Sequence, residues 1–268
     1  MSQPLPNRIR TLLTVVIVVA VTSSAAACDR EPQLATITSG RSGPPTMVLL
    51  HGYGSSAEQW APFRQTIRLP PQGRFVFPQA PDVTSPPDGP ANGRGWWRLA
   101  LASHIPTGKS IPDLSATQPP GLKVAASLVT ELVQSLGRSP GGSVILGGYS
   151  QGAMVASEVA FRTDVRIDAL VLLSGTLVDE ASWEREFHTR RGTPVFMSHG
   201  RSDPILPFEV ADRFRSKLEA AGVRVTWVPF DGGHEIPATV VNALNEFIAA
   251  LRLEQARLLP LQRTCASA

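Results

Sequence analysis

Short apolar runs alternate with amphipathic segments along most of this sequence. The apolar runs are rich in Val, Leu and Phe, which is typical of buried β-strands, and the segments between them place apolar residues on one helical face. Because strands and helices alternate, the pattern predicts an α/β fold with a mostly parallel central sheet and helices on both faces. The predicted strands are Thr46–Leu50, Arg74–Phe77, Ser143–Leu146, Ala169–Leu173, Pro194–Ser198 and Arg224–Val228, and the predicted helices are Ala57–Thr66, Leu122–Leu136, Ala153–Phe161, Pro207–Ala221 and Pro237–Leu253.

One strand–turn–helix stretch carries a chemical pattern. The apolar strand Val144–Leu146 leads into Gly148-Tyr149-Ser150-Gln151-Gly152, after which a helical segment begins. This G-x-S-x-G turn is typical of a nucleophile elbow, in which a strained turn lifts a serine hydroxyl out of the sheet and the glycines avoid backbone collisions. A chance G-x-S-x-G is expected in roughly one chain in ten of this length, so the flanking strand and helix carry most of the weight. We therefore interpret Ser150 as a catalytic nucleophile.

A serine hydroxyl needs a base, and the base needs an acid that orients it. In this arrangement the acid and the histidine follow the serine along the chain, on loops after later strands. His234 lies after the Arg224–Val228 strand, behind two glycines that let the loop turn tightly, and Asp203 lies after the Pro194–Ser198 strand. The sequence thus predicts Ser150, Asp203 and His234 as the catalytic residues.

Other acidic and histidine residues offer alternatives. Asp179 follows the Ala169–Leu173 strand, the other place where this arrangement can supply an acid, and it remains an alternative to Asp203. Asp231 is more typical of a turn former that bonds its own backbone. The remaining histidines fit structural roles better: two precede a glycine at a strand end and would brace loops or pack there (His51 and His199), and two lie in polar surroundings typical of the surface (His104 and His188).

Two backbone N–H groups are predicted to bind the oxyanion that develops on a substrate carbonyl. Gln151 opens the helix after the serine, so its N–H has no partner within that helix. The second donor is expected from the loop after the first clear strand, His51-Gly52-Tyr53-Gly54, where the Tyr53 N–H would point into the site.

Together these motifs resemble the phospholipase/carboxylesterase family of α/β-hydrolases, which includes acyl-protein thioesterases and bacterial carboxylesterases. The resemblance runs from about Thr46 to about Ala250. It rests on the ordered set His51-Gly52-x-Gly54, Trp96-Trp97, Gly148-Tyr149-Ser150-Gln151-Gly152, Gly200-Arg201-Ser202-Asp203-Pro204 and Gly233-His234. The resemblance implies an α/β-hydrolase fold, a triad of Ser150, Asp203 and His234, and an oxyanion hole at Tyr53 and Gln151.

This chain departs from the pattern of that family in two places. The first loop continues Gly54-Ser55 where the family often has Gly-Asp, and the Trp-aromatic-Asp motif of the family appears here as Trp96-Trp97-Arg98. These departures leave the catalytic set intact, but they leave the acyl-group and leaving-group preference open. Trp96 and Trp97 either bind substrate by lining an acyl pocket or anchor their loop in the core.

The predicted activity is that of a serine carboxylesterase, which hydrolyses a carboxylic ester or thioester through an acyl-serine intermediate. It requires a small-molecule ester substrate and no cofactor. The same residues could serve a serine peptidase or a polyester depolymerase, and no feature of the sequence separates those substrates from small esters. A non-catalytic binding lipoprotein is a further alternative, although such proteins usually lose a member of the triad.

Composition weighs against other classes of function. The chain has 268 residues, 43% hydrophobic and 18% charged, which suits one medium or large domain. The formal net charge is +3, and no run of Lys or Arg with interleaved aromatic residues appears, so nucleic-acid binding has little support. No Cys/His cluster has the spacing of metal ligands.

The N-terminal segment resembles an export signal. Basic residues precede an apolar stretch, Leu12–Val21, that is too short to span a membrane. Ala25-Ala26-Ala27-Cys28 fits an imperfect bacterial lipobox, so residues 1–27 are predicted to be removed and Cys28 to be lipidated, which would hold the protein at a membrane. The alternative is ordinary cleavage at the same place and release of a soluble exported protein, in which a disulfide between Cys28 and Cys265 could form.

The rest of the chain divides into a linker, a domain and a tail. Residues 28–45 are polar and rich in Gly, Pro and Ser, which is typical of a tether, although a frayed first strand also fits. The catalytic domain is then predicted at 46–255 and a C-terminal tail at 256–268. Pro81–Pro90 and Ile105–Pro120 are predicted as long surface loops.

Overall fold

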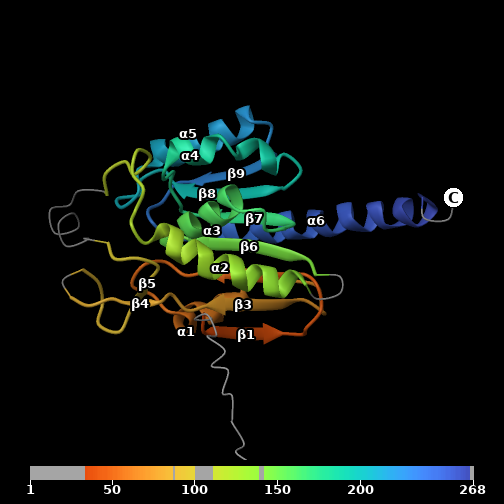
Figure 1. Cartoon of the computed structure of the whole chain (residues 1–268), viewed down its shortest axis with the longest axis horizontal. Helices are drawn as coiled ribbons and strands as arrows, with labels where there is room; N and C mark the ends of the chain where they lie inside the picture. Colours follow the sequence, from red (N-terminus) through yellow and green to blue (C-terminus); the bar gives the residue numbers. More distant parts are fainter. Residues whose placement is uncertain (1–33, 87, 100–110, 139–141, 266–268) are drawn as a thin grey trace, which may run out of the picture. The chain divides into compact units, whose positions relative to one another are not determined.

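A seven-stranded sheet lies at the centre of the fold in the computed structural model (Figure 1). Its strands are β1 (Thr36–Gly40), β2 (Thr46–Leu50), β3 (Arg74–Pro78), β6 (Val144–Tyr149), β7 (Ala169–Leu173), β8 (Val195–Gly200) and β9 (Val225–Phe230). They lie in the order β1-β3-β2-β6-β7-β8-β9, and all neighbours are parallel except β1, which runs antiparallel to β3. The structure describes residues 34–86, 88–99, 111–138 and 142–265, apart from the side chains of 253–265.

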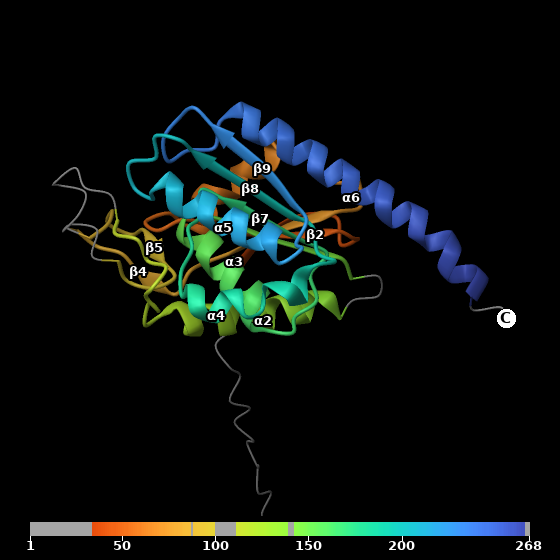
Figure 2. The same cartoon turned by 90° about the horizontal axis from the view of Figure 1, so that it is seen from above.

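Helices cover both faces of the sheet (Figure 2). One face carries α2 (Leu122–Gly137), α3 (Gln151–Arg162), α4 (Glu180–Glu184), the 3₁₀ turn Phe187–Arg190 and α5 (Phe208–Ala220), and the other carries α1 (Ala57–Trp60), the 3₁₀ turn Ala61–Gln65 and α6 (Ala238–Cys265). The predicted α/β architecture is thus confirmed. In addition, β4 (Asp82–Val83) and β5 (Arg94–Gly95) pair as a separate two-stranded hairpin.

The central strands and α3 form the most buried part of the core. Every residue of β2, β7 and β8 is buried, as expected for parallel strands covered on both faces. In α3 every residue but the last is buried, because small side chains such as Ala153 and Ala156 let it pack closely against the sheet and α2. The turn that joins β6 to α3 is therefore held between rigid elements.

The predicted elements agree with the structure most closely in the core. The bounds of β2 and β7 are those expected, whereas β6, β8 and β9 begin one residue later and run two or more residues further toward the loops that follow them. The expected helix Ala57–Thr66 is α-helical only to Trp60 and continues as a 3₁₀ turn. Pro62 explains this difference, because it has no N–H to extend the α-helical hydrogen bonds.

Regular secondary structure extends beyond residues 46–255 at both ends. Thr36–Gly40, predicted within a tether, pairs with β3 along its whole length, so the alternative of a first strand holds and the domain begins before residue 46. At the other end α6 continues to Cys265, so the segment expected as a C-terminal tail, 256–268, is helical as far as Cys265. The described residues all belong to one compact unit, Pro32–Ala268.

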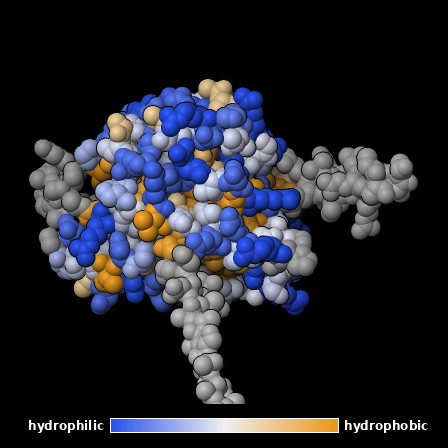
Figure 3. Space-filling model, in the orientation of Figure 1, coloured by the Kyte–Doolittle hydropathy of each residue, from blue (hydrophilic) through white to orange (hydrophobic). Residues whose placement is uncertain are grey.

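Several predictions concern residues outside the described ranges. The export signal, Cys28 with its lipid or disulfide, His104 and the first part of the Ile105–Pro120 loop all lie there, whereas residues 111–120 are described and contain no helix or strand. Within the described ranges, no helix combines the length and apolar character needed to cross a bilayer. The face in Figure 3 is mostly hydrophilic, with apolar residues in separate patches.

Candidate active site

The turn between β6 and α3 has the geometry of a nucleophile elbow. Ser150 has φ 54° and ψ −119°, in the left-handed half of backbone space that an L-residue adopts only under strain. The Ser150 N–H donates to the Leu173 carbonyl at 2.9 Å, which fixes the turn to β7. A β-carbon at Gly148 would collide with the Gly152 backbone, and one at Gly152 would collide with the Leu50 carbonyl. The two glycines of the motif are therefore required by close backbone packing.

Ser150, His234 and Asp203 lie in one hydrogen-bonded series at the carboxyl ends of β6, β9 and β8. The Ser150 hydroxyl oxygen lies 2.9 Å from Nε2 of His234, and Nδ1 of His234 lies 2.7 Å from Oδ2 of Asp203. The His234 side chain is 10% exposed and that of Asp203 is fully buried. The structure thus brings together all three residues that the sequence singled out.

The Asp203 carboxylate is fixed by its own loop. Its Oδ1 accepts hydrogen bonds from the backbone N–H groups of Ile205 and Leu206, at 2.8 and 2.9 Å. Burial alone would raise the pKa of Asp203, but hydrogen bonds from His199, His234 and the Leu206 backbone outweigh it and hold the pKa well below its usual range. Asp203 is therefore an anion throughout the pH range in which a histidine titrates.

The alternative residues have other surroundings. The Asp179 carboxylate accepts a hydrogen bond from Gln118 Nε2 at 2.5 Å, and Asp231 is almost fully exposed beside Arg201, so neither contacts His234. His51 braces its loop as expected: its Nε2 accepts from the Ala80 N–H at 3.2 Å, so its Nδ1–H donates to the Gly52 carbonyl at 2.8 Å. Burial lowers the pKa of His51, which keeps the ring neutral. His188 is exposed, as predicted.

The loop after β2 passes close to the elbow. A β-carbon at Gly52 would lie 3.4 Å from Cβ of Ser150, which brings the following residue, Tyr53, to the site. In the described part of the chain, neither the Tyr53 N–H nor the Gln151 N–H has a hydrogen-bond acceptor. Both amides therefore remain available to a substrate oxygen.

The side chain of Gln151 has a structural role that the sequence did not reveal. Its Oε1 accepts from the Trp96 N–H and its Nε2 donates to the Trp97 carbonyl, both at 2.8 Å. The Trp96 indole N–H donates to the His51 carbonyl at 2.9 Å, and both tryptophans are at most 3% exposed. Of the two interpretations of the tryptophans, these contacts support anchoring of the loop, and a substrate-binding role stays a prediction.

Tyr149, the residue before the serine, also contacts the site. Its hydroxyl donates to the backbone carbonyl of His234 at 2.7 Å, and the two rings lie 5.0 Å apart. Burial, and then the charges of Asp203 and Glu235, raise the pKa of Tyr149, so the phenol stays a neutral donor. The sequence located Tyr149 inside the motif but gave no signal for this bond, which joins residues 149 and 234.

We expect Tyr149→Phe to lower kcat/KM for an ester substrate by up to about tenfold. The variant keeps the ring and removes one neutral hydrogen bond, which contributes about 1 kcal/mol to holding the histidine loop. The measurement is steady-state kinetics together with the thermal unfolding midpoint. Unchanged kinetics in the folded variant would mean that the bond does not orient His234.

Comparison with known proteins now identifies the relatives of this chain. The model of the phospholipase/carboxylesterase family matches residues 32–252, which is most of the sequence. The chain belongs to this family. It is accordingly a hydrolase of ester bonds, and the resemblance read from the motifs is confirmed.

Individual relatives agree with the family assignment. The acyl-protein thioesterase 1 of Neurospora crassa is 23% identical over 216 residues, which cover 76% of this chain and 85% of that protein. The acyl-protein thioesterase 1 of Gibberella zeae is 26% identical over 219 residues, which cover 77% of this chain and 89% of that protein. Two solved structures share the fold. Esterase PE8 is 25% identical, with a TM-score of 0.67, and the match covers 82% of this chain and 100% of that one. Zea mays acyl-protein thioesterase 2 is 21% identical, with a TM-score of 0.66, and the match covers 81% of this chain and 99% of that one. The α/β-hydrolase fold is thus confirmed.

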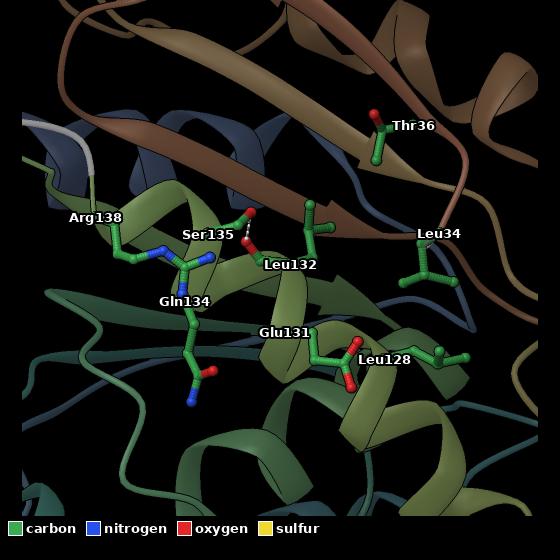
Figure 4. A pocket seen from close by; sticks show the side chains of 8 residues that line it. All are labelled: Leu34, Thr36, Leu128, Glu131, Leu132, Gln134, Ser135 and Arg138. Atoms are coloured by element: carbon green, nitrogen blue, oxygen red, sulfur yellow. Dashed lines mark hydrogen bonds between the residues drawn. The ribbon is translucent and has the colours of Figure 1, made fainter. Parts of the chain in front are cut away.

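A hollow of about 360 Å³ between the β1 edge and α2 lies apart from the candidate active site (Figure 4). None of its lining residues comes from the loops that carry Ser150, Asp203 or His234. The lining combines three leucines with polar side chains that form no nucleophile–base pair: Leu34, Thr36, Leu128, Glu131, Leu132, Gln134, Ser135 and Arg138.

Proposed function

We propose that the chain is a serine carboxylesterase that hydrolyses carboxylic esters, and thioesters of similar shape, with Ser150 as nucleophile. The observation that carries the proposal is the series of two hydrogen bonds, 2.9 Å from Ser150 to His234 and 2.7 Å from His234 to Asp203. These distances are those of a serine–base–acid triad, and the strained elbow presents the hydroxyl to a bound acyl group.

Each residue has a defined role in the proposed mechanism. Ser150 attacks the substrate carbonyl while His234 Nε2 takes its proton, and the buried Asp203 carboxylate holds the imidazole and stabilises its positive charge. His234 then gives the proton to the leaving alkoxide or thiolate, which leaves an acyl-serine. Water activated by the same imidazole releases the carboxylic acid and restores Ser150.

The oxyanion is proposed to lie between the backbone N–H groups of Tyr53 and Gln151. Gln151 is the first residue of α3, so its N–H points out of the helix terminus toward developing negative charge. Such a donor contributes about 3 kcal/mol to the transition state in enzymes of this chemistry. The Gln151 side chain, bonded to Trp96 and Trp97, keeps this part of the site in place.

Other substrates of the same machinery are the alternatives. A peptide bond or a polyester would meet the same nucleophile, but the family of this chain and its named relatives are esterases and thioesterases, which favours small esters and acyl groups. A non-catalytic binding role has less support, because a protein that only binds has no need for strain at Ser150 or a buried carboxylate behind His234.

The test is hydrolysis of p-nitrophenyl esters from acetyl to palmitoyl by the chain from residue 29 onward. A maximum at short acyl chains would indicate a closed acyl site, and a maximum at long chains would indicate an open groove of the lipase or thioesterase kind. A folded protein that hydrolyses no ester in the series would contradict the proposal.

We expect kcat/KM to fall as the pH drops below neutrality, because a protonated His234 cannot accept the Ser150 proton. The pKa of Asp203 lies well below its usual range, so this carboxylate stays ionised and does not contribute to the loss of activity. The measurement is a profile of kcat/KM from pH 5 to 9. A profile that is flat from pH 8 to 5 would argue against a histidine base.

Export and lipidation of Cys28 stay predictions, because they rest on residues 1–28 alone. Intact-mass measurement of the protein made in a bacterial host checks them. A mature chain that begins at Cys28 and carries a diacylglyceryl group is expected, whereas retention of residues 1–27 would contradict export.

A further inference from the structure

A second histidine lies behind the acid of the site. His199, near the end of β8, is fully buried, and its Nε2 lies 3.2 Å from Oδ2 of Asp203 and 2.9 Å from the carbonyl of Leu206. The ring also meets Phe208 edge-on at 6.2 Å between centroids. His199 thus touches Oδ2, the Asp203 oxygen that binds His234.

The contacts of His199 assign its proton. Both partners of Nε2, a carbonyl and a carboxylate, are acceptors, so Nε2 must carry the hydrogen. Nδ1 is buried and has no hydrogen-bond partner among the described residues. A second proton there would leave a buried N–H unpaired, which is more costly than an unpaired lone pair on a neutral ring. His199 is therefore a neutral Nε2–H donor whose hydrogen is shared between Leu206 and Asp203.

The Nε2–H of His199 also affects the negative charge on the Asp203 carboxylate. Two backbone N–H groups donate to Oδ1, and two imidazoles lie close to Oδ2, that of His199 in β8 and that of His234 in the loop after β9. The Asp203 charge also helps to raise the pKa of Tyr149, whose phenol stays neutral and so adds no charge beside this carboxylate. A donor next to Oδ2 withdraws part of its negative charge, and that charge is what stabilises a protonated His234.

We propose that His199 is a positioning residue that holds Asp203 Oδ2 toward His234 and lowers the pH at which the catalytic histidine becomes protonated. The proposal rests on the proposed esterase mechanism, because it assigns His199 a function only through Asp203 and His234. A histidine that merely packed in the loop would affect folding but not the pH dependence of the reaction.

The test compares three variants at this position. His199→Gln places an amide nitrogen three bonds from Cβ, as Nε2 is in histidine, whereas His199→Asn carries the same amide one bond too short, and His199→Leu fills the space without a donor. The profile of kcat/KM against pH, for the best p-nitrophenyl ester, is measured for each variant and the wild type, with unfolding midpoints alongside.

The expected results differ between the variants. His199→Leu and His199→Asn should move the midpoint of the acid limb up by about 0.5–1 pH unit, because the full charge of Asp203 then favours the protonated base. Their plateau value of kcat/KM should also fall by roughly tenfold, since Oδ2 is no longer held. His199→Gln should restore both quantities to near the wild-type values. If His199→Leu does not fold, the Gln and Asn pair carries the comparison.

Two outcomes would overturn the proposal. Acid limbs that coincide in wild type, Gln and Asn variants, with only stability changed, would leave His199 a packing residue. Equal shifts in the Gln and Asn variants would show that the reach of the donor does not matter.

A spectroscopic readout separates this failure from failure of the proposed function. The low-field proton resonance of His234 Nδ1–H, assigned by its loss in His234→Ala, is expected further downfield in His199→Asn than in His199→Gln, because the remaining bond to Oδ2 strengthens. This readout needs no turnover. An unchanged resonance in both variants contradicts the role of His199, whereas a shifted resonance in a protein that hydrolyses no ester contradicts only the esterase assignment.

Discussion

Ser150→Ala is expected to lower kcat/KM for the best p-nitrophenyl ester by at least about a thousandfold, to a residual rate that reflects binding and the oxyanion donors alone. The substitution removes the hydroxyl oxygen of Ser150, which lies 2.9 Å from Nε2 of His234, and leaves the backbone of the elbow unchanged. The rate is measured at pH 8 for the variant and the wild type alike.

The matched control is Ser157→Ala, on the same helix. The Ser157 hydroxyl donates to the Ala153 carbonyl at 2.9 Å, a bond within α3 that does not reach the site. This variant should keep its activity within about twofold and should still react with a serine-directed fluorophosphonate, because only a local helix bond is lost. Substantial turnover in Ser150→Ala, or labelling of that variant, would mean that another residue is the nucleophile.

Asp203→Asn has the second largest expected effect, a fall in kcat of about a thousandfold or more. The reason lies in the two backbone N–H groups of Ile205 and Leu206, which bind Oδ1 and would bind the amide oxygen of the asparagine in the same place. Its NH₂ group would then face Nδ1 of His234 and donate to it. The remaining imidazole proton would move to Nε2, where it faces Ser150 and prevents the ring from accepting the serine proton.

Asp179→Asn is the control for this prediction, because Asp179 is the other acid that the order of motifs allows. Asp179 lies at the start of α4, where its carboxylate accepts a hydrogen bond from Gln118 and makes no contact with His234. Activity close to wild type is expected there, together with unfolding midpoints that show both variants to be folded. A reversed result, with Asp179→Asn inactive and Asp203→Asn active, would mean that the acid is Asp179, which follows β7.

The arrangement of the site followed from the sequence because it depends on topology. Each member of the Ser150, Asp203 and His234 set follows an apolar strand, and carboxyl ends of parallel strands meet at one edge of the sheet. Neither the distances between side chains nor their fine contacts follow from that argument. The bond from the Tyr149 hydroxyl to the His234 carbonyl joins two loops, and no spacing in the chain indicates it.

The features that escaped prediction are polar or very short. β1 consists of Thr, Ile, Thr, Ser and Gly, with Ile37 as its one large apolar residue, and it alternates exposed and partly buried positions at the sheet edge, so its sequence resembles a linker. The strands β4 and β5 have two residues each, too few to show any periodicity. The Gln151 side chain could only be placed once the Trp96 loop was seen beside α3.

His234, the proposed catalytic base, lies in the loop after the edge strand β9, and this position affects how activity would be lost on heating. Among the described strands, β9 pairs only with β8 and is the least buried of the parallel ones, so its opening is expected to require less free energy than unfolding of the core. Two hydrogen bonds oppose that opening. The Tyr149 hydroxyl donates to the His234 carbonyl, and the Ser174 hydroxyl donates to the Glu235 carbonyl at 3.3 Å. Thermal inactivation should therefore set in below the global melting temperature, with amides of β9 exchanging before those of β6 and β7.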